Sequence, residues 1–228
     1  LMLAAQEGHK EVCELLIENG AEIEPSDGNG FRALMLAAQG GHKEVCELLI
    51  EKGAEIEASD SNGLRALMLA AQEGQKEVCE LLIKKGAKVE AANKDGFRAL
   101  MIAAQNGNKE VCKLLIEKGA EIEAANKDRV RALMLAAQEG HKEVCEILIE
   151  RGAEIEAATK GGLRSLMLAA INGHKEVCEL LIEKGANVNL KNNWENTPLH
   201  ITAQRGHLDT CKLLLQKGSD ITAKGNDG

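Results

Sequence analysis

The sequence predicts an all-α solenoid, in which helix-turn-helix units of 33 residues are stacked and joined by short β-hairpin-like tips. The cysteines carry the first sign of this repeat, because they are spaced at a constant interval of 33: Cys13, Cys46, Cys79, Cys112, Cys145, Cys178 and Cys211. The six methionines keep the same interval from Met2 to Met167. With one Trp, two Phe and no Tyr, the core must be built from small aliphatic side chains, which suits thin stacked helices.

Three columns of glycine mark the ends of the elements in each unit. Gly53 and its equivalents follow an amphipathic run such as residues 45–52, which predicts a helix that ends at a residue with positive φ. Gly41 and its equivalents separate this helix from an Ala-rich segment such as 33–39, which predicts a turn between two helices. The third column predicts a hairpin tip in each unit: Gly30, Gly63, Gly96, Gly162 and Gly228, with Arg129 and Glu195 as exceptions.

One unit therefore runs through a tip, a short helix, a turn, a longer helix and a return segment such as 54–58. We expect a single domain over 1–228, with full repeats at 28–60, 61–93, 94–126, 127–159, 160–192 and 193–225. A partial repeat covers 1–27, and 226–228 begin a further one. The expected core of one unit is Leu34, Met35, Ala37, Ala38, Val45, Cys46, Leu48 and Leu49.

The last full unit contains the run Asn196-Thr197-Pro198-Leu199-His200, and the other units contain pieces such as Gly41-His42-Lys43-Glu44-Val45. With the period of 33, these motifs resemble those of the ankyrin-repeat family. The resemblance covers essentially the whole chain and implies an ankyrin-repeat solenoid. It also implies a function in protein–protein interaction rather than catalysis, with partner contacts in a concave groove formed by the tips and first helices.

Most units depart from the family pattern at the start of the first helix. Where the family has T-P-L-H, repeat 28–60 has Arg32-Ala33-Leu34-Met35, so the methionine column is expected to pack in the core. A positive charge at a helix N-terminus opposes the helix dipole, so a carboxylate is expected near each arginine. The column that starts at Glu24 and Glu57 could supply it, which predicts an Arg/Glu ladder; the alternative is that these charges are solvated.

Composition excludes several kinds of partner. The formal net charge of −8 disfavours nucleic acid and anionic membrane surfaces. No apolar run approaches the roughly 20 residues that span a bilayer, and the first residues lack the pattern of a signal peptide. We therefore expect an intracellular protein, located in the cytoplasm.

Histidine and cysteine lie four residues apart on the second helix, as in His42 and Cys46, a spacing that could present two metal ligands. We favour core packing for the cysteine and a polar role at the helix start for the histidine, because Gln75 and Asn108 replace the histidine without other changes nearby. Equivalent cysteines in stacked helices should lie about 10 Å apart, too far for a disulfide. Seven unpaired buried cysteines indicate a reducing compartment. We expect no metal and no cofactor.

No catalytic site is expected either. The carboxylates recur as identical copies, whereas a catalytic pair needs one asymmetric pocket that separates two pKa values. No phosphate-binding loop, nucleophile elbow or zinc-protease motif is present in the sequence. The chain is therefore expected not to be an enzyme.

The columns that vary between units predict the binding surface. An apolar column follows the tip glycine beside polar residues, as expected for a protein-binding patch, although these side chains could instead brace neighbouring tips. Trp194 stands out, because its equivalents are small and polar; it could anchor a partner or cap the last repeat. The candidate partner-binding residues are Phe31, Asn62, Leu64, Asp95, Phe97, Asp128, Val130, Leu163 and Trp194.

Two functions remain open at this point. The first is a module that binds another protein through the groove, and the second is an engineered or consensus-like scaffold with no natural partner. The near identity of the units over 28–159 suits the second, whereas the drift of the last unit suits a natural array or a deliberate cap. In either case we expect a monomer.

Overall fold

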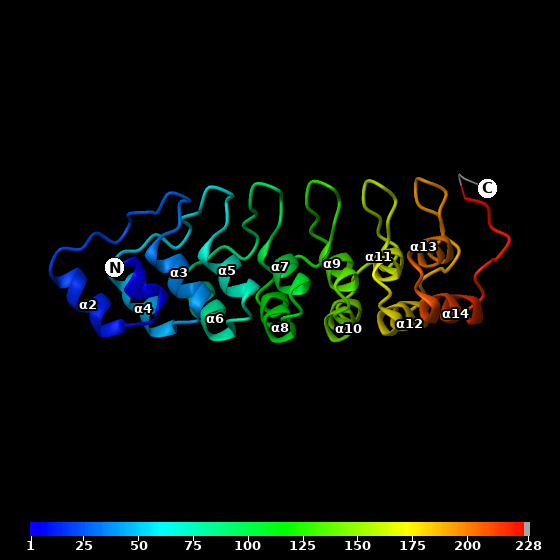
Figure 1. The fold of residues 1–228 in the computed structure, drawn as a ribbon. Helices are drawn as coiled ribbons and strands as arrows, with labels where there is room; N and C mark the ends of the chain where they lie inside the picture. Colours follow the sequence, from blue (N-terminus) through cyan, green and yellow to red (C-terminus); the bar gives the residue numbers. More distant parts are fainter. Residues whose placement is uncertain (226–228) are drawn as a thin grey trace. The chain divides into compact units, whose positions relative to one another are not determined.

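A computed structural model of the chain describes residues 1–225, which contain fourteen helices and no strand (Figure 1). The first helices of the units are α1 (Met2–Gln6), α3 (Ala33–Gly40), α5 (Ala66–Gln72), α7 (Ala99–Gln105), α9 (Ala132–Gln138), α11 (Ser165–Ile171) and α13 (Pro198–Arg205). The second helices are α2 (Lys10–Glu18), α4 (Lys43–Glu51), α6 (Lys76–Lys84), α8 (Lys109–Glu117), α10 (Lys142–Glu150), α12 (Lys175–Glu183) and α14 (Leu208–Gln216). The predicted repeat start at 226–228, with Gly228, lies outside the described residues.

The chain divides into two compact units. The first holds Leu1–Ala103 and Glu110–Glu121, and the second holds Ala104–Lys109 and the described residues from Ile122 onward. In the first unit, α3 packs between α1 and α5, and α4 packs between α2 and α6. In the second unit, α11 and α12 are flanked in the same way by α9 with α13 and by α10 with α14. Within each unit the tips project from the same side of the helices (Figure 1).

The two helices of a repeat are buried to different degrees. The first helix is short and Ala-rich, so it is almost entirely enclosed; Leu34 and Met35 are buried, as predicted. The second helix is amphipathic, with Cys46 and Leu49 fully buried on one face. Burying one such leucine contributes about 1.5–3 kcal/mol, which makes the repeated apolar columns the main source of stability. The whole predicted core set of this unit is buried: Leu34, Met35, Ala37, Ala38, Val45, Cys46, Leu48 and Leu49.

The predicted glycine roles are confirmed by the backbone. Gly53, after the second helix, has a φ of 97°, and Gly140, between the two helices, has a φ of 80°. A Cβ on Gly140 would also lie 2.6 Å from the imidazole of His174 in the next repeat. Gly140 therefore serves both the turn and the close approach of the neighbouring repeat. Arg129 and Glu195 take the tip position with φ values of 61° and 58°, although neither is a glycine.

The histidine column links neighbouring repeats. His174 stands at the N-cap of α12, but its side chain does not cap that helix. Its Nε2 instead lies 3.0 Å from the backbone oxygen of Gln138, near the end of α9 in the preceding repeat. His42, His141 and His207 make the same contact with the repeat before each of them. The column therefore has a structural role that runs between repeats.

All seven cysteines are free, as predicted, but one of them is not buried. Burial raises the pKa of the thiols of Cys46, Cys79 and Cys145 to about 12, as it does for Cys112 and Cys178. The prediction of seven buried thiols is wrong for Cys211, which is partly exposed because no described repeat packs beyond α14. Its Sγ lies 3.1 Å from the hydroxyl oxygen of Thr202.

Among the helices of residues 1–225, none is long and apolar enough to cross a membrane.

Candidate functional site

Every tip but that of repeat 160–192 is ordered by one Asx residue just before it. In repeat 61–93, Oδ1 of Asp60 accepts hydrogen bonds from the backbone N–H groups of Asn62 and Leu64. Asp27, Asn93, Asn126 and Asn192 do the same in their tips. Such local bonds fix an Asx turn and leave the next side chains in a defined position. The sequence analysis missed this column, which recurs as Asp or Asn every 33 residues except at Thr159.

Neighbouring tips are joined through their backbones. The N–H of Ser61 donates to the oxygen of Asn29 over 2.9 Å, and the N–H of Lys94 donates to the oxygen of Asn62 over 3.0 Å. In the second compact unit, Lys160 donates to Asp128 and Asn193 donates to Gly161 in the same way. Within each unit these bonds place the candidate residues of successive tips side by side. We call residues 28–31, 61–64, 94–97, 127–130, 160–163 and 193–196 the tip surface.

The predicted Arg/Glu ladder is confirmed and ties the base of each tip to the preceding repeat. Nε of Arg98 lies 3.1 Å from Oε2 of Glu90. The other four pairs are Arg32–Glu24, Arg65–Glu57, Arg131–Glu123 and Arg164–Glu156, at 3.1–3.4 Å. These carboxylates have a second role that was not foreseen: Oε1 of Glu90 accepts a hydrogen bond from the N–H of Glu121, in the return segment of the next repeat. At the last repeat both members of the pair are replaced: Asn189 stands in the glutamate column and Thr197 in the arginine column.

The apolar column of the tip surface is half-buried. Phe31, Leu64 and Phe97 are neither exposed nor enclosed, whereas Asn62 and Asp95 beside them are exposed. In the second unit, Val130 and Leu163 pack against the core cluster of Met134, Ala157 and Leu168. The apolar column therefore braces the tips against the first helices, and its uncovered edges lie beside polar side chains. Asp128 is exposed like Asn62 and Asp95.

Trp194 lies over the preceding tip with 53% of its surface exposed. A Cβ on Gly161 would be 2.9 Å from Cη2 of the indole, so the ring occupies the space that a side chain at 161 would need. This contact explains why Gly161 replaces the Asn or Asp of the other tips. The ring covers part of repeat 160–192 and still offers an apolar surface to solvent.

No group of three or more His, Cys, Asp or Glu side chains that could hold a metal occurs in the part of the chain that the structure describes. The histidine and the cysteine whose spacing suggested metal ligands lie in two different environments. His42 faces the backbone of the preceding repeat, and Cys46 is fully buried in the core.

The model of the family described as "Ankyrin repeats (3 copies)" matches residues 1–93, 89–159 and 156–225. The chain belongs to the ankyrin-repeat family. Ankyrin repeats are generally protein–protein interaction modules, and the family is typically non-enzymatic. A search of curated protein sequences gave no match.

The ankyrin pattern is closest to the family motif in the last repeat. There Thr197 and His200 form a capping box at the start of α13, in which the threonine hydroxyl accepts from the N–H of His200. Nδ1 of His200 accepts in turn from the N–H of Thr197. In α3, α5, α9 and α11 the N-cap arginine makes no capping bond, and each of these arginines forms an ion pair with a glutamate instead.

Proposed function

We propose that this ankyrin-repeat chain binds another protein through the tip surface and the exposed edge of the first helices. The observation that carries the proposal is the combination of ordered tip backbones with side chains that differ from one repeat to the next. Asx turns order five of the tips, Thr159 takes the equivalent place before the tip of repeat 160–192, and the tip backbones are bonded to neighbouring tips. A surface that is already ordered loses little conformational entropy on binding, so it favours affinity.

The chemistry of the tip surface supports a protein partner. Half-buried Phe31, Leu64 and Phe97 lie beside exposed polar side chains, which is the mixture found at the centre and rim of protein interfaces. Trp194 is the strongest candidate anchor, because tryptophan is enriched among residues that dominate interface energies. The first helices add an exposed position that varies between repeats: Glu7, Gly40, Glu73, Asn106, Glu139, Asn172 and Arg205.

The test compares capture of a partner by wild type and by matched variants. Trp194→Ala and Phe97→Asp should lose the partner, with a loss of affinity of at least about tenfold for each once the partner is purified. Glu47→Lys and Glu51→Lys, on the second helix α4, should retain it. Circular dichroism and urea unfolding of every variant separate loss of binding from loss of folding. A partner that is lost with the α4 variants and kept with the tip variants would overturn the proposal.

The competing proposal is a consensus-like or engineered scaffold without a natural partner. The five equivalent Arg/Glu pairs favour such a scaffold, because each pair stabilises the same position of its repeat. The capture experiment distinguishes the two, because a scaffold of this kind retains no protein whose binding depends on Trp194 or Phe97.

A further inference from the structure

Two neighbouring tips of the second compact unit carry a net positive charge. They are residues 127–130 and 160–163, which we call the basic tips. Their charged side chains are three cations and one carboxylate: Lys127, Arg129, Lys160 and Asp128. No tip before them in the sequence has more cations than carboxylates. The charge therefore belongs to two particular repeats within the array and does not follow from the repeat pattern.

The residues that order the tips change in the same direction. Asp27 and Asp60 order two of the earlier tips, and each brings a carboxylate to its tip. Asn126 and Thr159 make the equivalent hydrogen bonds in the basic tips, but their side chains are uncharged. The turn chemistry is therefore kept, while its negative charge is lost at the two places where cations are added.

Most of the positive charge is free to meet a partner. The side chains of Lys127, Arg129 and Lys160 are all exposed. Nζ of Lys160 lies 3.5 Å from Oδ1 of Asp128 in the preceding tip, whereas Lys127 and Arg129 form no ion pair with any described residue. The glutamates at the base of the two tips are already paired with the arginines of the ladder. One carboxylate therefore opposes three cations on this surface.

The opposite charge of the same two repeats lies on their second helices. α10 and α12 each hold one lysine and three glutamates. The tips project from one side of the first helices, and α10 and α12 lie on the other side (Figure 1). Exposed charges are screened over about 8 Å at physiological ionic strength. A molecule at the basic tips therefore meets their cations and is little affected by the carboxylates of α10 and α12.

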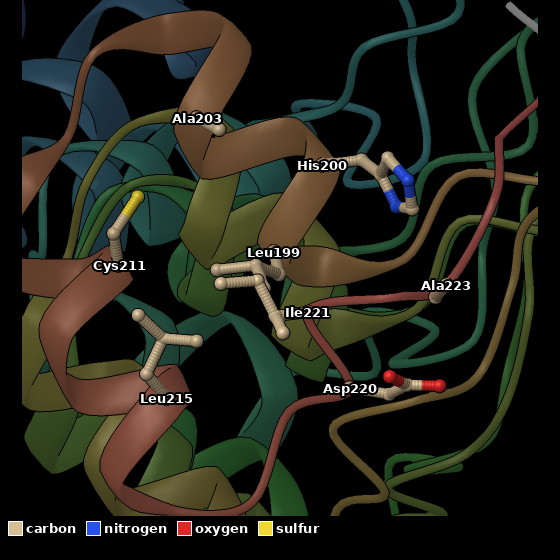
Figure 2. Close-up of a pocket in the computed structure, with 8 residues that line it drawn as sticks. All are labelled: Leu199, His200, Ala203, Cys211, Leu215, Asp220, Ile221 and Ala223. Carbon is tan, nitrogen blue, oxygen red and sulfur yellow. The ribbon is translucent and has the colours of Figure 1, made fainter. Parts of the chain in front are cut away.

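The second compact unit also contains an apolar hollow of about 330 Å³. It lies between α13, α14 and the segment after α14, where Leu199, Leu215 and Ile221 surround it (Figure 2). No lysine or arginine of the described residues lines it, and Asp220 adds a carboxylate at its edge. The hollow therefore does not compete with the basic tips for a negatively charged partner.

Arg129 is held in a backbone conformation that arginine rarely adopts. Its φ of 61° lies in the left-handed region, where most of the other tips have glycine. Such a conformation costs stability in a residue with a side chain, and residues of this kind are concentrated at functional positions. The cation of Arg129 is therefore kept in the tip at some cost to folding, which points to a role in binding.

We propose that the basic tips bind an acidic segment of a protein partner, a stretch of chain rich in Asp and Glu. The inference rests on the proposed function, because it names the chemistry of the partner that the tip surface takes. Ammonium and guanidinium groups donate charge-assisted hydrogen bonds to carboxylates. Nucleic acid is disfavoured, because the formal net charge of −8 and the carboxylate of Asp128 oppose a continuous phosphate backbone.

The first test titrates the wild-type chain with a fluorescein-labelled peptide of Glu-Glu-Leu triplets. A peptide of about 12 residues spans about 40 Å when extended, enough to cross two tips about 10 Å apart. It should bind at least about tenfold more tightly than the matched peptide of Gln-Gln-Leu triplets, and about 0.5 M NaCl should weaken it at least about threefold relative to about 0.05 M. Equal affinities for the two peptides, or no binding, would overturn the proposal.

The second test reverses charge at matched positions. Lys127→Glu with Lys160→Glu should weaken binding of the acidic peptide at least about tenfold, because like charges in contact repel. Lys142→Glu with Lys175→Glu is the control: it makes the same substitutions in the same repeats, at exposed positions of α10 and α12, and gives the same net charge. The control should bind like wild type. Equal losses in the two variants would mean that only the overall charge matters, and the proposal would fail.

Arg129→Gly separates binding from folding. Glycine suits the backbone at this position, so the variant should be at least as stable as wild type in urea and still bind the acidic peptide about threefold more weakly. An unchanged affinity would contradict the role assigned to Arg129. A single-stranded oligothymidylate that bound more tightly than the peptide would indicate a nucleic-acid surface and overturn the proposal.

The capture experiment distinguishes this inference from the function on which it rests. If Trp194→Ala and Phe97→Asp lose a partner that Lys127→Glu with Lys160→Glu retains, the tip surface binds a protein but the basic tips do not recognise it. If Trp194→Ala and Phe97→Asp retain every captured protein, the proposed function itself is wrong. Loss of the same partner in all of these variants, with wild-type helicity, supports both.

Discussion

Oε2 of Glu57 lies 3.3 Å from Nε of Arg65, across the boundary between repeats 28–60 and 61–93. The other oxygen of the same carboxylate accepts a hydrogen bond from the backbone N–H of Lys88 over 3.0 Å. Arg65 in turn donates to the backbone oxygen of Ala92 over 2.9 Å. One carboxylate and one guanidinium therefore connect the return segment of one repeat to the first helix and return segment of the next.

This geometry predicts that two substitutions at Glu57 lower the free energy of unfolding by different amounts. Glu57→Gln removes the charge but keeps an oxygen for Lys88, so it should lower the free energy of unfolding by about 0.5 kcal/mol, the scale of a partly exposed ion pair. Glu57→Ala removes both contacts and should cost about 1–2 kcal/mol. Urea unfolding measures both. Glu51→Ala, at an exposed position on α4, should stay within about 0.5 kcal/mol of wild type, and equal costs for the two Glu57 variants would contradict a bridging role.

The buried thiols predict a loss of stability at alkaline pH. A thiol with an ordinary pKa of 9.0 in the unfolded chain and about 12 in the folded chain stays protonated longer when folded. Between pH 9 and 12 the unfolded state therefore binds fewer protons, and the free energy of unfolding falls as pH rises. Below pH 9 this contribution is fully present. Replacing Cys46, Cys79, Cys112, Cys145 and Cys178 by valine should flatten the fall, as measured by urea unfolding at pH 7, 9, 10 and 11.

The same substitutions provide the control for other titrating groups. Every other titratable group is unchanged in the valine variant, so the difference between the two proteins isolates the thiols. An identical pH dependence in the two proteins would contradict the prediction. Each substitution should change the stability at pH 7 by less than about 1.5 kcal/mol, since valine conserves the apolar character of the site.

The repeated columns explain why so much of the fold could be predicted from the sequence. A 33-residue period fixes which positions are equivalent, so one assignment for Cys46 or Leu49 serves every repeat. The Arg/Glu ladder could be predicted for the same reason, because a charge that opposes the helix dipole recurs beside a column that can neutralise it. The second role of the glutamates was missed, because a backbone N–H donor leaves no mark in the sequence.

Features that occur once could not be predicted in this way. Cys211 belongs to the cysteine column, but it is partly exposed because nothing among the described residues packs beyond the last repeat. The contact of Trp194 with Gly161 depends on the path of one side chain between two tips. The partner-binding role of the tip residues stays a prediction, because it depends on a second molecule.

The Trp194–Gly161 contact predicts coupling between the two positions. Gly161→Asn, which restores the residue of two other tips, should push the indole away and cost about 0.5–1 kcal/mol. In the background of Trp194→Asn the same change should cost close to nothing, because no ring stands in its way. Urea unfolding of the four proteins gives the coupling energy, and indole fluorescence should shift to longer wavelength in Gly161→Asn. Equal costs in both backgrounds would mean that the ring does not pack on residue 161.

The backbone conformation in the tip of repeat 127–159 leads us to expect that one substitution there stabilises the protein. Arg129 has a φ of 61°, a conformation that glycine adopts at the same position in other tips. Arg129→Gly should relieve this strain and raise the free energy of unfolding by about 0.5 kcal/mol, since the gain in the folded state exceeds the added entropy of the unfolded chain. Arg129→Ala removes the side chain without relieving the backbone, so it should not stabilise. Lys127→Gly, two residues earlier in the same exposed tip, should lower the stability by about 0.5–1 kcal/mol, because its backbone gains nothing from glycine. If Arg129→Gly lowered the stability as much as Lys127→Gly does, the positive φ would not be a source of strain in this tip.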